Sequence, residues 1–183
     1  VGENGAGFAV DIDGDIIGTT TNITITTAST ASVDFNATAG NVRHLTVNHA
    51  SCVLNSENSC VLSGNLTITA GNFNANGNEL TVGGTTVVGA GGSADAATLT
   101  CAGSAITLGS GITGDNIGLT VNQGGTVAGG SGVHILGSLH MVDHADAKMT
   151  ATSHASGTTI NSEATSGSLS NYNFVIYDGA TFD

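Results

Sequence analysis

Three aspartates at alternate positions, Asp11, Asp13 and Asp15, form the sharpest polar cluster in the sequence. Closely spaced carboxylates supply the oxygen ligands that Ca²⁺ prefers. The segment is therefore a candidate calcium site, although it lacks the later Glu of an EF-hand loop. In a strand, alternate positions share one face, so a solvated acidic face is the simpler interpretation. Ca²⁺ is the one cofactor that the sequence suggests.

The cysteines allow two interpretations. Cys52 and Cys60 lie eight positions apart. A disulfide between them would close a short loop and imply an oxidising, extracellular setting. The alternative is a pair of buried thiols that act as small hydrophobic residues, and the sequence does not choose between the two. Cys101 lies in the strand-like segment Leu99-Thr100-Cys101 and is expected in the core.

Histidines are a second source of metal ligands. The chain has His44, His49, His134, His140, His144 and His154. Three or four ligands must converge at a zinc ion, and His140, Asp143 and His144 are the nearest approach to such a set. If the chain winds in coils of about 20 residues, His134 and His154 would also stack on one face. Isolated surface or hydrogen-bonded histidines remain the simpler interpretation.

Charge and motifs narrow the functional classes. The net charge is -12, and Arg43 and Lys148 are the only Lys or Arg residues. Neutralising phosphates requires Lys or Arg, so we expect no nucleic-acid partner. No apolar run reaches the length of a membrane span, and no membrane insertion is expected. Neither a Gly-x-Ser-x-Gly elbow nor a phosphate-binding loop is present. We therefore expect a protein that is not an enzyme.

A short repeated unit indicates the elements that position these residues. An apolar residue, a Thr and a second apolar residue recur as Ile23-Thr24-Ile25, Leu45-Thr46-Val47, Leu66-Thr67-Ile68, Leu80-Thr81-Val82, Leu99-Thr100-Cys101 and Leu119-Thr120-Val121, with Leu139-His140-Met141 as a weaker copy. Most units follow the previous one after about 20 residues, the length of one solenoid coil, but the step from Leu66 to Leu80 is shorter. Gly and Asn clusters between them, such as Asn76-Gly77-Asn78 and Gly124-Gly125, allow the positive-φ corners of a winding chain.

This pattern predicts an all-β fold, a β-solenoid or parallel β-helix with coils of about 20 residues. Gly numbers 28, Pro is absent and aromatic residues make up only 4%. A β-sandwich is the alternative fold, but sandwiches usually have longer strands and bulkier aromatic residues. Residues 138–150 could form one short helix. We expect a single domain over residues 1–183 that is either complete or part of a longer chain.

The run from Gly64 to Val82 resembles the repetitive β-helical parts of bacteriophage virion proteins, namely tail fibres, tail spikes and appendage or decoration proteins. The segment from Val10 to Ile17 is similar to a strand-turn unit of phage fibre chains. The resemblance covers most of residues 8–135, and bacterial surface adhesins share it. It implies a structural role on the virion surface or in the extracellular space, often as a trimer, and carries over no catalytic residue.

Three functions follow as expectations. The first is a structural viral component, a fibre, spike or capsid decoration that self-assembles and displays a surface. The second is a bacterial or archaeal cell-surface adhesin, and the third is a β-helical enzyme that cleaves glycans. Copies of the same chain are the expected partners, because closed symmetry satisfies every copy equally, and the resemblance implies that a trimer is preferred. Other virion or surface proteins are further partners. Neither end resembles a cap, so neighbouring subunits or flanking chain should cover the ends.

Overall fold

The computed structural model describes residues 10–11, 21–34, 42–90, 96–101, 106–108, 118–128, 134–136, 139–141, 148–150, 160–162, 174–176 and 181–182. These residues form 18 strands and no helix. The strands are β1 (Val10–Asp11), β2 (Thr21–Ile25), β3 (Ser29–Asp34), β4 (Val42–Ser56), β5 (Cys60–Leu62), β6 (Leu66–Asn74), β7 (Leu80–Val82), β8 (Thr86–Val88), β9 (Ala97–Thr100), β10 (Ile106–Leu108), β11 (Leu119–Val121), β12 (Gly125–Ala128), β13 (His134–Leu136), β14 (Leu139–Met141), β15 (Lys148–Thr150), β16 (Ile160–Ser162), β17 (Phe174–Ile176) and β18 (Thr181–Phe182).

The all-β prediction is confirmed over the described part of the chain. The prediction of a helix over residues 138–150 is wrong for the two parts of this range that the structure describes. Leu139–Met141 and Lys148–Thr150 are strands that pair with β11 and β12, respectively. Pairing with a neighbouring strand satisfies the backbone groups that a helix would satisfy internally.

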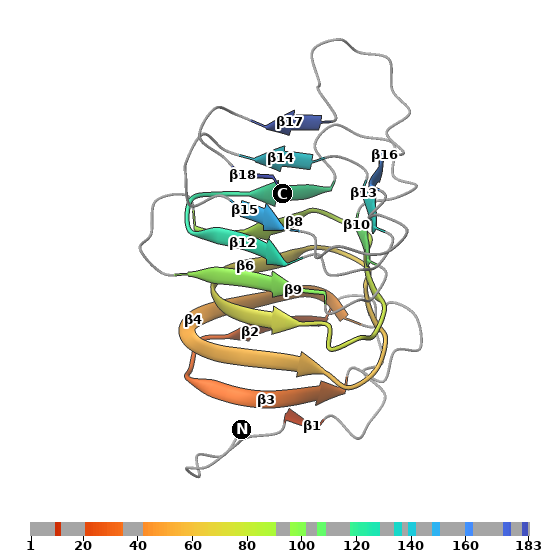
Figure 1. The fold of residues 1–183 in the computed structure, drawn as a ribbon. Helices are drawn as coiled ribbons and strands as arrows, with labels where there is room; N and C mark the ends of the chain where they lie inside the picture. Colours follow the sequence, from red (N-terminus) through yellow and green to blue (C-terminus); the bar gives the residue numbers. More distant parts are fainter. Residues whose placement is uncertain are drawn as a thin grey trace.

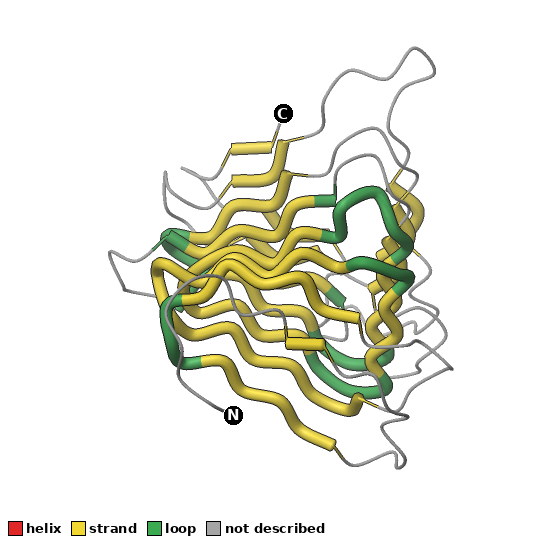
Figure 2. Tube along the Cα trace, turned by 90° about the horizontal axis from the view of Figure 1, so that it is seen from below, coloured by secondary structure: helices red, strands yellow, loops and turns green. Residues whose placement is uncertain are grey.

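Parallel pairing joins the strands into one curled sheet that contains three ladders (Figures 1 and 2). The first ladder contains β2, the first part of β4 and of β6, then β8, β11, β14 and β17. The second contains β1, β3, the last part of β4 and of β6, then β9, β12, β15 and β18. The third contains the start of β4, then β5, β7, β10, β13 and β16.

The longest strand, β4, contributes to all three ladders. Val42 pairs with Leu62 in the third ladder, Leu45 pairs with Leu66 in the first, and Leu54 pairs with Phe73 in the second. The pairing of β4 with β6 shifts register between Val47 and Val53, so the two strands bend together between the first and second ladders. Figure 1 shows β4 as a curved ribbon that wraps around one side of the molecule.

The repeated apolar-Thr-apolar units do not form one stack, which corrects the expected single series. Ile23, Leu45 and Leu66 follow one another in the first ladder. Thr86 comes next, and Leu119 follows it after a longer interval of chain. The units that begin at Leu80 and Leu99 belong to the third and second ladders. The short step from Leu66 to Leu80 in the sequence is therefore a change of ladder.

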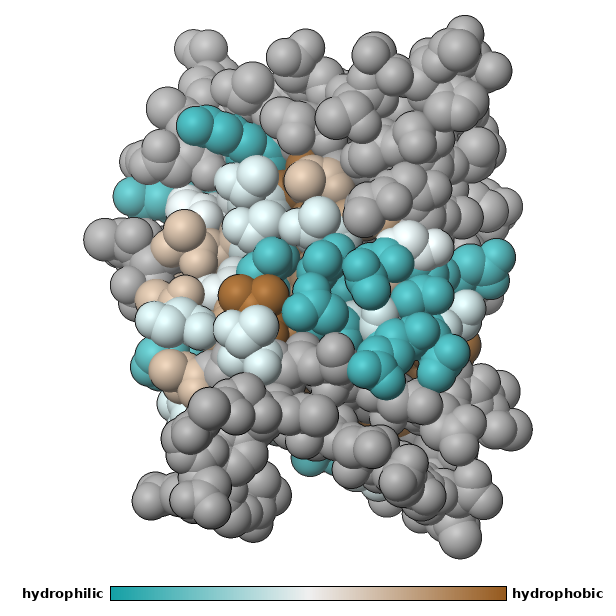
Figure 3. All heavy atoms as spheres, turned by 60° about the horizontal axis from the view of Figure 1, so that its bottom comes forward, coloured by the Kyte–Doolittle hydropathy of each residue, from teal (hydrophilic) through white to brown (hydrophobic). Residues whose placement is uncertain are grey.

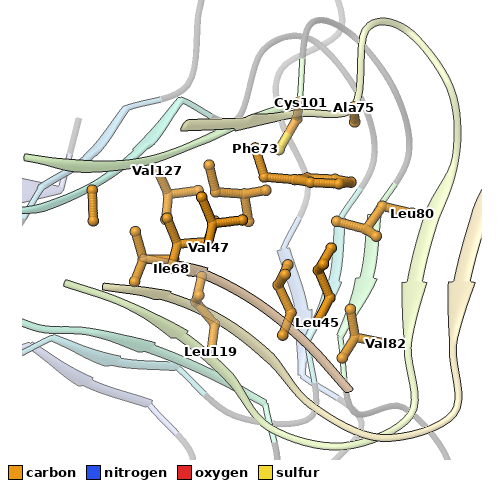
Figure 4. Close-up of a cluster of buried hydrophobic side chains, with 14 of the residues drawn as sticks. Leu45, Val47, Ile68, Phe73, Ala75, Leu80, Val82, Cys101, Leu119 and Val127 are labelled. Atoms are coloured by element: carbon orange, nitrogen blue, oxygen red, sulfur yellow. The ribbon is translucent and has the colours of Figure 1, made fainter. Parts of the chain in front are cut away.

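The core lies between the ladders and is made mostly of aliphatic side chains (Figure 4). Strand burial alternates, so that one face of each strand points inward. In the second ladder, an inward column runs through Leu54, Phe73, Leu99 and Val127, each paired with the next. All four side chains are buried. Stacking of apolar side chains on successive strands therefore generates a continuous core from short segments.

Candidate functional site: the outward hydroxyl and amide surface

The outward face of the first ladder carries a column of β-branched residues. Thr24 pairs with Thr46, Thr46 pairs with Thr67, and the column continues through Val87 to Thr120. Each of these positions lies between two inward neighbours on its strand, because successive side chains of a strand point to opposite faces. Thr is common on such half-buried pleated surfaces. The column presents hydroxyl and methyl groups without charge.

Asparagine stands beside threonine on the outward face of the second ladder. Asn55 pairs with Asn74, and the Asn74 Nδ2 donates to the Asn55 Oδ1 at 3.0 Å. On the neighbouring column, Asn72 accepts a 3.2 Å hydrogen bond from the Thr100 hydroxyl. These bonds run along the stacking direction, from one strand to the next. They hold the amide groups in fixed orientations across β4, β6 and β9.

Side-chain amides also join the ends of β4 and β6, in what we name the amide corner: Ser56, Asn74, Asn76, Gly77 and Asn78. The Asn78 Nδ2 donates to the Ser56 carbonyl at 2.9 Å, and the Asn76 Nδ2 approaches the same carbonyl at 3.4 Å. Asn74 Oδ1 accepts from the Asn76 backbone at 2.9 Å. Hydrophilic residues gather over one side of the molecule in the space-filling view (Figure 3).

A two-residue turn shapes the amide corner. The Asn78 N–H donates to the Ala75 carbonyl at 2.9 Å, and the two residues between them have positive φ, 54° at Asn76 and 82° at Gly77. Two successive positive φ values define a type I′ turn, for which Asn-Gly is the preferred pair. The positive-φ corner expected at Asn76-Gly77-Asn78 is therefore confirmed.

At another corner, two side chains each accept a hydrogen bond from a backbone N–H that directly precedes the next strand of the first ladder. The His44 Nδ1 accepts from the Asn65 N–H at 2.8 Å, just before β6, and the Asn65 Oδ1 accepts from the Thr85 N–H at 3.1 Å, just before β8. The two bonds repeat the same arrangement at successive steps of the ladder. They satisfy backbone donors where the chain turns and the strand ladder is interrupted.

His44 and His49 are both hydrogen-bond acceptors. His49 Nδ1 accepts from the Ser51 N–H at 3.1 Å, as His44 Nδ1 accepts from Asn65. Nδ1 is therefore the acceptor nitrogen of both rings. Among described residues, no group of three or more His, Cys, Asp or Glu comes together as a metal site.

The remaining histidines do not form the expected stack. His134 pairs with Ile106 and Ile160, so the predicted stacking of His134 on His154 is wrong at the His134 position. His140 lies in the first ladder, where it pairs with Thr120 and Val175. The predicted cluster around His140 also includes Asp143 and His144, which lie outside the described residues, as does His154.

The structure does not bring Cys52 and Cys60 together in a disulfide. Both are free thiols, Cys52 in the second ladder beside Ser29 and Cys60 in the third beside Leu80. Burial raises the pKa of the Cys52 thiol, and it raises the pKa of Cys60 to about 12. The interpretation as buried small residues therefore describes both. Cys101 is buried as predicted, and desolvation raises its pKa to about 12.

The predicted calcium ligands fall largely outside the described residues. Asp11 is the last residue of β1, where it pairs with Asp34 of β3. Asp13 and Asp15 lie outside the described part of the chain. The Ca²⁺ site at Asp11, Asp13 and Asp15 therefore stays a prediction.

Sequence inspection missed Thr86, whose side chain is fully buried in the first ladder between Leu66 and Leu119. The segment Gly84-Thr85-Thr86-Val87 lacks an apolar residue at the first position of the repeated unit. The signal that could have found it is spacing, because Thr86 follows Leu66 by about 20 residues, the length expected of one coil.

Comparison with models of known protein families, with characterised proteins and with solved structures finds no match. In the described part of the chain, no helix is long and apolar enough to cross a membrane.

The described outward strand faces of the first two ladders carry mainly hydroxyl and amide groups. These groups are donors and acceptors fixed on rigid strands. Arg43 and Lys148, the only Lys or Arg residues of the chain, are both exposed. Hydroxyl and amide groups can hydrogen-bond a polar surface without long-range attraction or repulsion. The arrangement is therefore suited to close contact between rigid surfaces.

Proposed function

We propose that the chain is a β-solenoid and that it serves as a non-enzymatic structural component of a viral particle, a fibre, spike or capsid decoration. The observation that carries the proposal is the in-register parallel stacking of short strands in three ladders. A chain built this way gains length by adding coils, each of which needs only its neighbours to bury its inward face. That property suits a rod or a spike.

The surface composition supports assembly from copies of the same chain. Like charges on successive strands repel one another, and the described outward columns of the first two ladders carry mainly Thr and Asn, with Lys148 as the one Lys or Arg among their paired positions. Rigid, uncharged surfaces can approach a second copy without the cost of burying unpaired charges. We therefore propose a homo-oligomer, with a trimer preferred, on the virion surface or in the extracellular space.

An adhesin on a bacterial or archaeal cell surface is the second candidate. The Asn55, Asn74 and Thr100 side chains favour it, because an ordered set of amides and hydroxyls can bind polar groups of a receptor. In that case the outward face of the second ladder would be the surface that contacts the receptor. Substitution of Asn74 by Ala would then weaken attachment to cells without changing the oligomeric state.

The solenoid itself can be tested by cross-linking between strands. Thr46 and Thr67 are paired in the first ladder, where parallel strands lie about 4.8 Å apart, a Cα separation that a disulfide can bridge. The double variant Thr46→Cys, Thr67→Cys should form a disulfide on mild oxidation. The matched control, Thr67→Cys with Thr81→Cys, should not, because Thr81 pairs with Val61 and Thr107 in the third ladder. Equal cross-linking of both pairs would contradict the solenoid.

The assembly role can be tested by native mass spectrometry and by electron microscopy of the purified chain. We expect a trimer and a rod-shaped particle across a range of salt and Ca²⁺ concentrations. A monomer that persists under all of these conditions would contradict self-assembly. Adhesion to cells by that monomer would favour the second candidate.

A further inference from the structure

We propose that Asn76 is a site of spontaneous modification, at which its side-chain amide is converted to Asp and isoaspartate through a cyclic imide formed with Gly77. The reaction needs an exposed asparagine, a following residue without a side chain, and a backbone nitrogen that is not held elsewhere. The amide corner brings these three features together at one position of the described chain.

Exposure is the first feature. Asn76 and Gly77 are both exposed at the tip of the turn between β6 and β7. A Cβ added at Gly77 would meet no heavy atom within 4 Å, so the space around the reacting nitrogen is open. Exposed loop tips are also where proteolytic cleavage concentrates in folded proteins.

The second feature is the hydrogen bonding of the reacting groups. The Asn76 amide is held by one long contact, 3.4 Å from its Nδ2 to the Ser56 carbonyl. Among the hydrogen bonds of the described residues, none uses the Gly77 N–H as donor, whereas its neighbours Asn76 and Asn78 both donate. The nucleophile and the leaving group are therefore both available.

The neighbouring asparagines lack these features. For Asn74 the attacking atom would be the Ala75 nitrogen, which is buried and donates to the Thr100 carbonyl at 2.8 Å. The Asn74 amide is also engaged at both ends, because its Nδ2 donates to Asn55 and its Oδ1 accepts from Asn76. Asn72 precedes Phe73, which is fully buried within β6. Selectivity for Asn76 over Asn72 and Asn74 follows from the fold.

The reaction balances without a further reagent except water. The Gly77 nitrogen attacks Cγ of Asn76, the new C–N bond closes a five-membered imide, and Nδ2 leaves as ammonia with the proton from the Gly77 nitrogen. Water then opens the imide at either carbonyl. One opening leaves an ordinary aspartate at this position, and the other leaves isoaspartate, in which the backbone runs through the former side chain.

Both products alter the amide corner. Each adds a negative charge to a region that already contains the exposed Glu57 and Glu79. Each also replaces the Asn76 donor that faces the Ser56 carbonyl. Isoaspartate lengthens the backbone by one carbon, which is incompatible with the 2.9 Å bond between the Ala75 carbonyl and the Asn78 N–H. The connection between β6 and β7 should therefore loosen as the protein ages.

The test uses the full-length chain, incubated in mildly alkaline buffer prepared with ¹⁸O-labelled water. Cleavage after Glu57 and Glu79 releases residues 58–79, in which mass spectrometry can locate each modified asparagine. We expect the mass of the peptide to increase at Asn76 by the difference between the labelled oxygen that is gained and the NH that is lost. Both the aspartate and the isoaspartate product should be present. Asn72, Asn74 and Asn78 in the same peptide should stay unchanged, and Asn76→Gln should abolish the shift.

A synthetic peptide of residues 74–80 is the matched reference for the unfolded turn. Conversion of the peptide without conversion of Asn76 in the folded chain would overturn the proposal, since the turn would then protect the site. Conversion of Asn72 or Asn74 in the folded chain as fast as Asn76 would also overturn it. Faster hydrogen exchange at the Asn78 amide after conversion would support the predicted loosening.

Discussion

Thr86 lies directly against Leu66 in the first ladder, and its hydroxyl is buried without a hydrogen-bond partner among the described residues. Leu119 pairs with Thr86 from the other side, so the hydroxyl sits in an aliphatic column. A buried hydroxyl that makes no hydrogen bond costs stability, because it has lost its bonds to water. The residue therefore marks a local defect in an otherwise apolar core.

Replacing Thr86 by Val should stabilise the protein. Val keeps the branched shape and removes the unsatisfied hydroxyl, so we expect a gain of about 1 kcal/mol in the free energy of unfolding. Urea denaturation followed by circular dichroism measures it. The matched control is Thr67→Val on the outward face of the same ladder, where the change should stay within about 0.5 kcal/mol. A loss of stability in Thr86→Val would show that the hydroxyl has a partner.

Leu80 and Thr86 show how far the sequence alone predicts this fold. The alternation of apolar and polar residues predicted strands, which the structure contains. The Gly and Asn clusters predicted positive-φ turns, and such turns are present at Asn76-Gly77 and at Gly124. The apolar-Thr-apolar pattern could not assign the unit at Leu80 to its ladder, because units of different ladders have the same local sequence. It also missed Thr86, where stacking on Leu66 overrides polarity.

The candidate site was less predictable than the fold. The amide corner depends on bonds between residues that are far apart in the sequence, such as Asn78 to Ser56 and Asn74 to Asn55. These contacts arise from register, which a single sequence does not encode locally. The short spacing of Cys52 and Cys60 along the sequence likewise suggested a disulfide, because spacing alone does not assign a residue to a ladder. The two cysteines are close along the chain, but they belong to different ladders.

A glycine pair tests the close approach of neighbouring chain segments. A Cβ at Gly84 would press on the Asn65 side chain and lie 2.9 Å from the Gly64 carbonyl carbon and oxygen. A Cβ at Gly83 would meet the Ser63 carbonyl oxygen at 3.0 Å and no atom closer. Among the described residues, neither glycine has a positive φ. The difference between them is therefore steric.

We expect Gly84→Ala to destabilise the protein by about 1–3 kcal/mol, since backbone at the contact cannot move away without disturbing the ladder. Gly83→Ala should cost less. The midpoints of urea unfolding for the two variants provide the comparison. Equal midpoints would mean that the chain segments at Gly64 and Gly84 are not held in such close contact.

Phe73 is the largest fully buried side chain of the described residues and lies between Leu54 and Leu99 in its column. Phe73→Ala should leave a cavity and cost about 3–5 kcal/mol. Phe73→Leu should cost less, because leucine already fills the positions above and below. Thermal and urea unfolding of both variants measure the effect, and the Leu variant remains informative if the Ala variant does not fold. Equal losses would contradict the stacked column.

The three thiols should resist labelling in the folded chain. Burial raises the pKa of Cys60 and Cys101 from 9.0 to about 12, and it also raises that of Cys52. The thiolate is the reactive form, so a thiol reagent in mildly alkaline buffer should label none of the three in the folded chain and all three in urea. The matched control is Ser63→Cys, which places a thiol at an exposed position and should be labelled at once.

The same raised pKa values predict how stability depends on pH. Between pH 9.0 and about 12 the unfolded chain gives up the protons of Cys60 and Cys101 while the folded chain keeps them. The unfolded state then binds fewer protons, so the free energy of unfolding falls as pH rises through this window. Well below pH 9.0 both states keep the protons, and the contribution is constant. Cys60→Ala should reduce the alkaline loss in urea unfolding, and an unchanged slope in this variant would contradict burial as its cause.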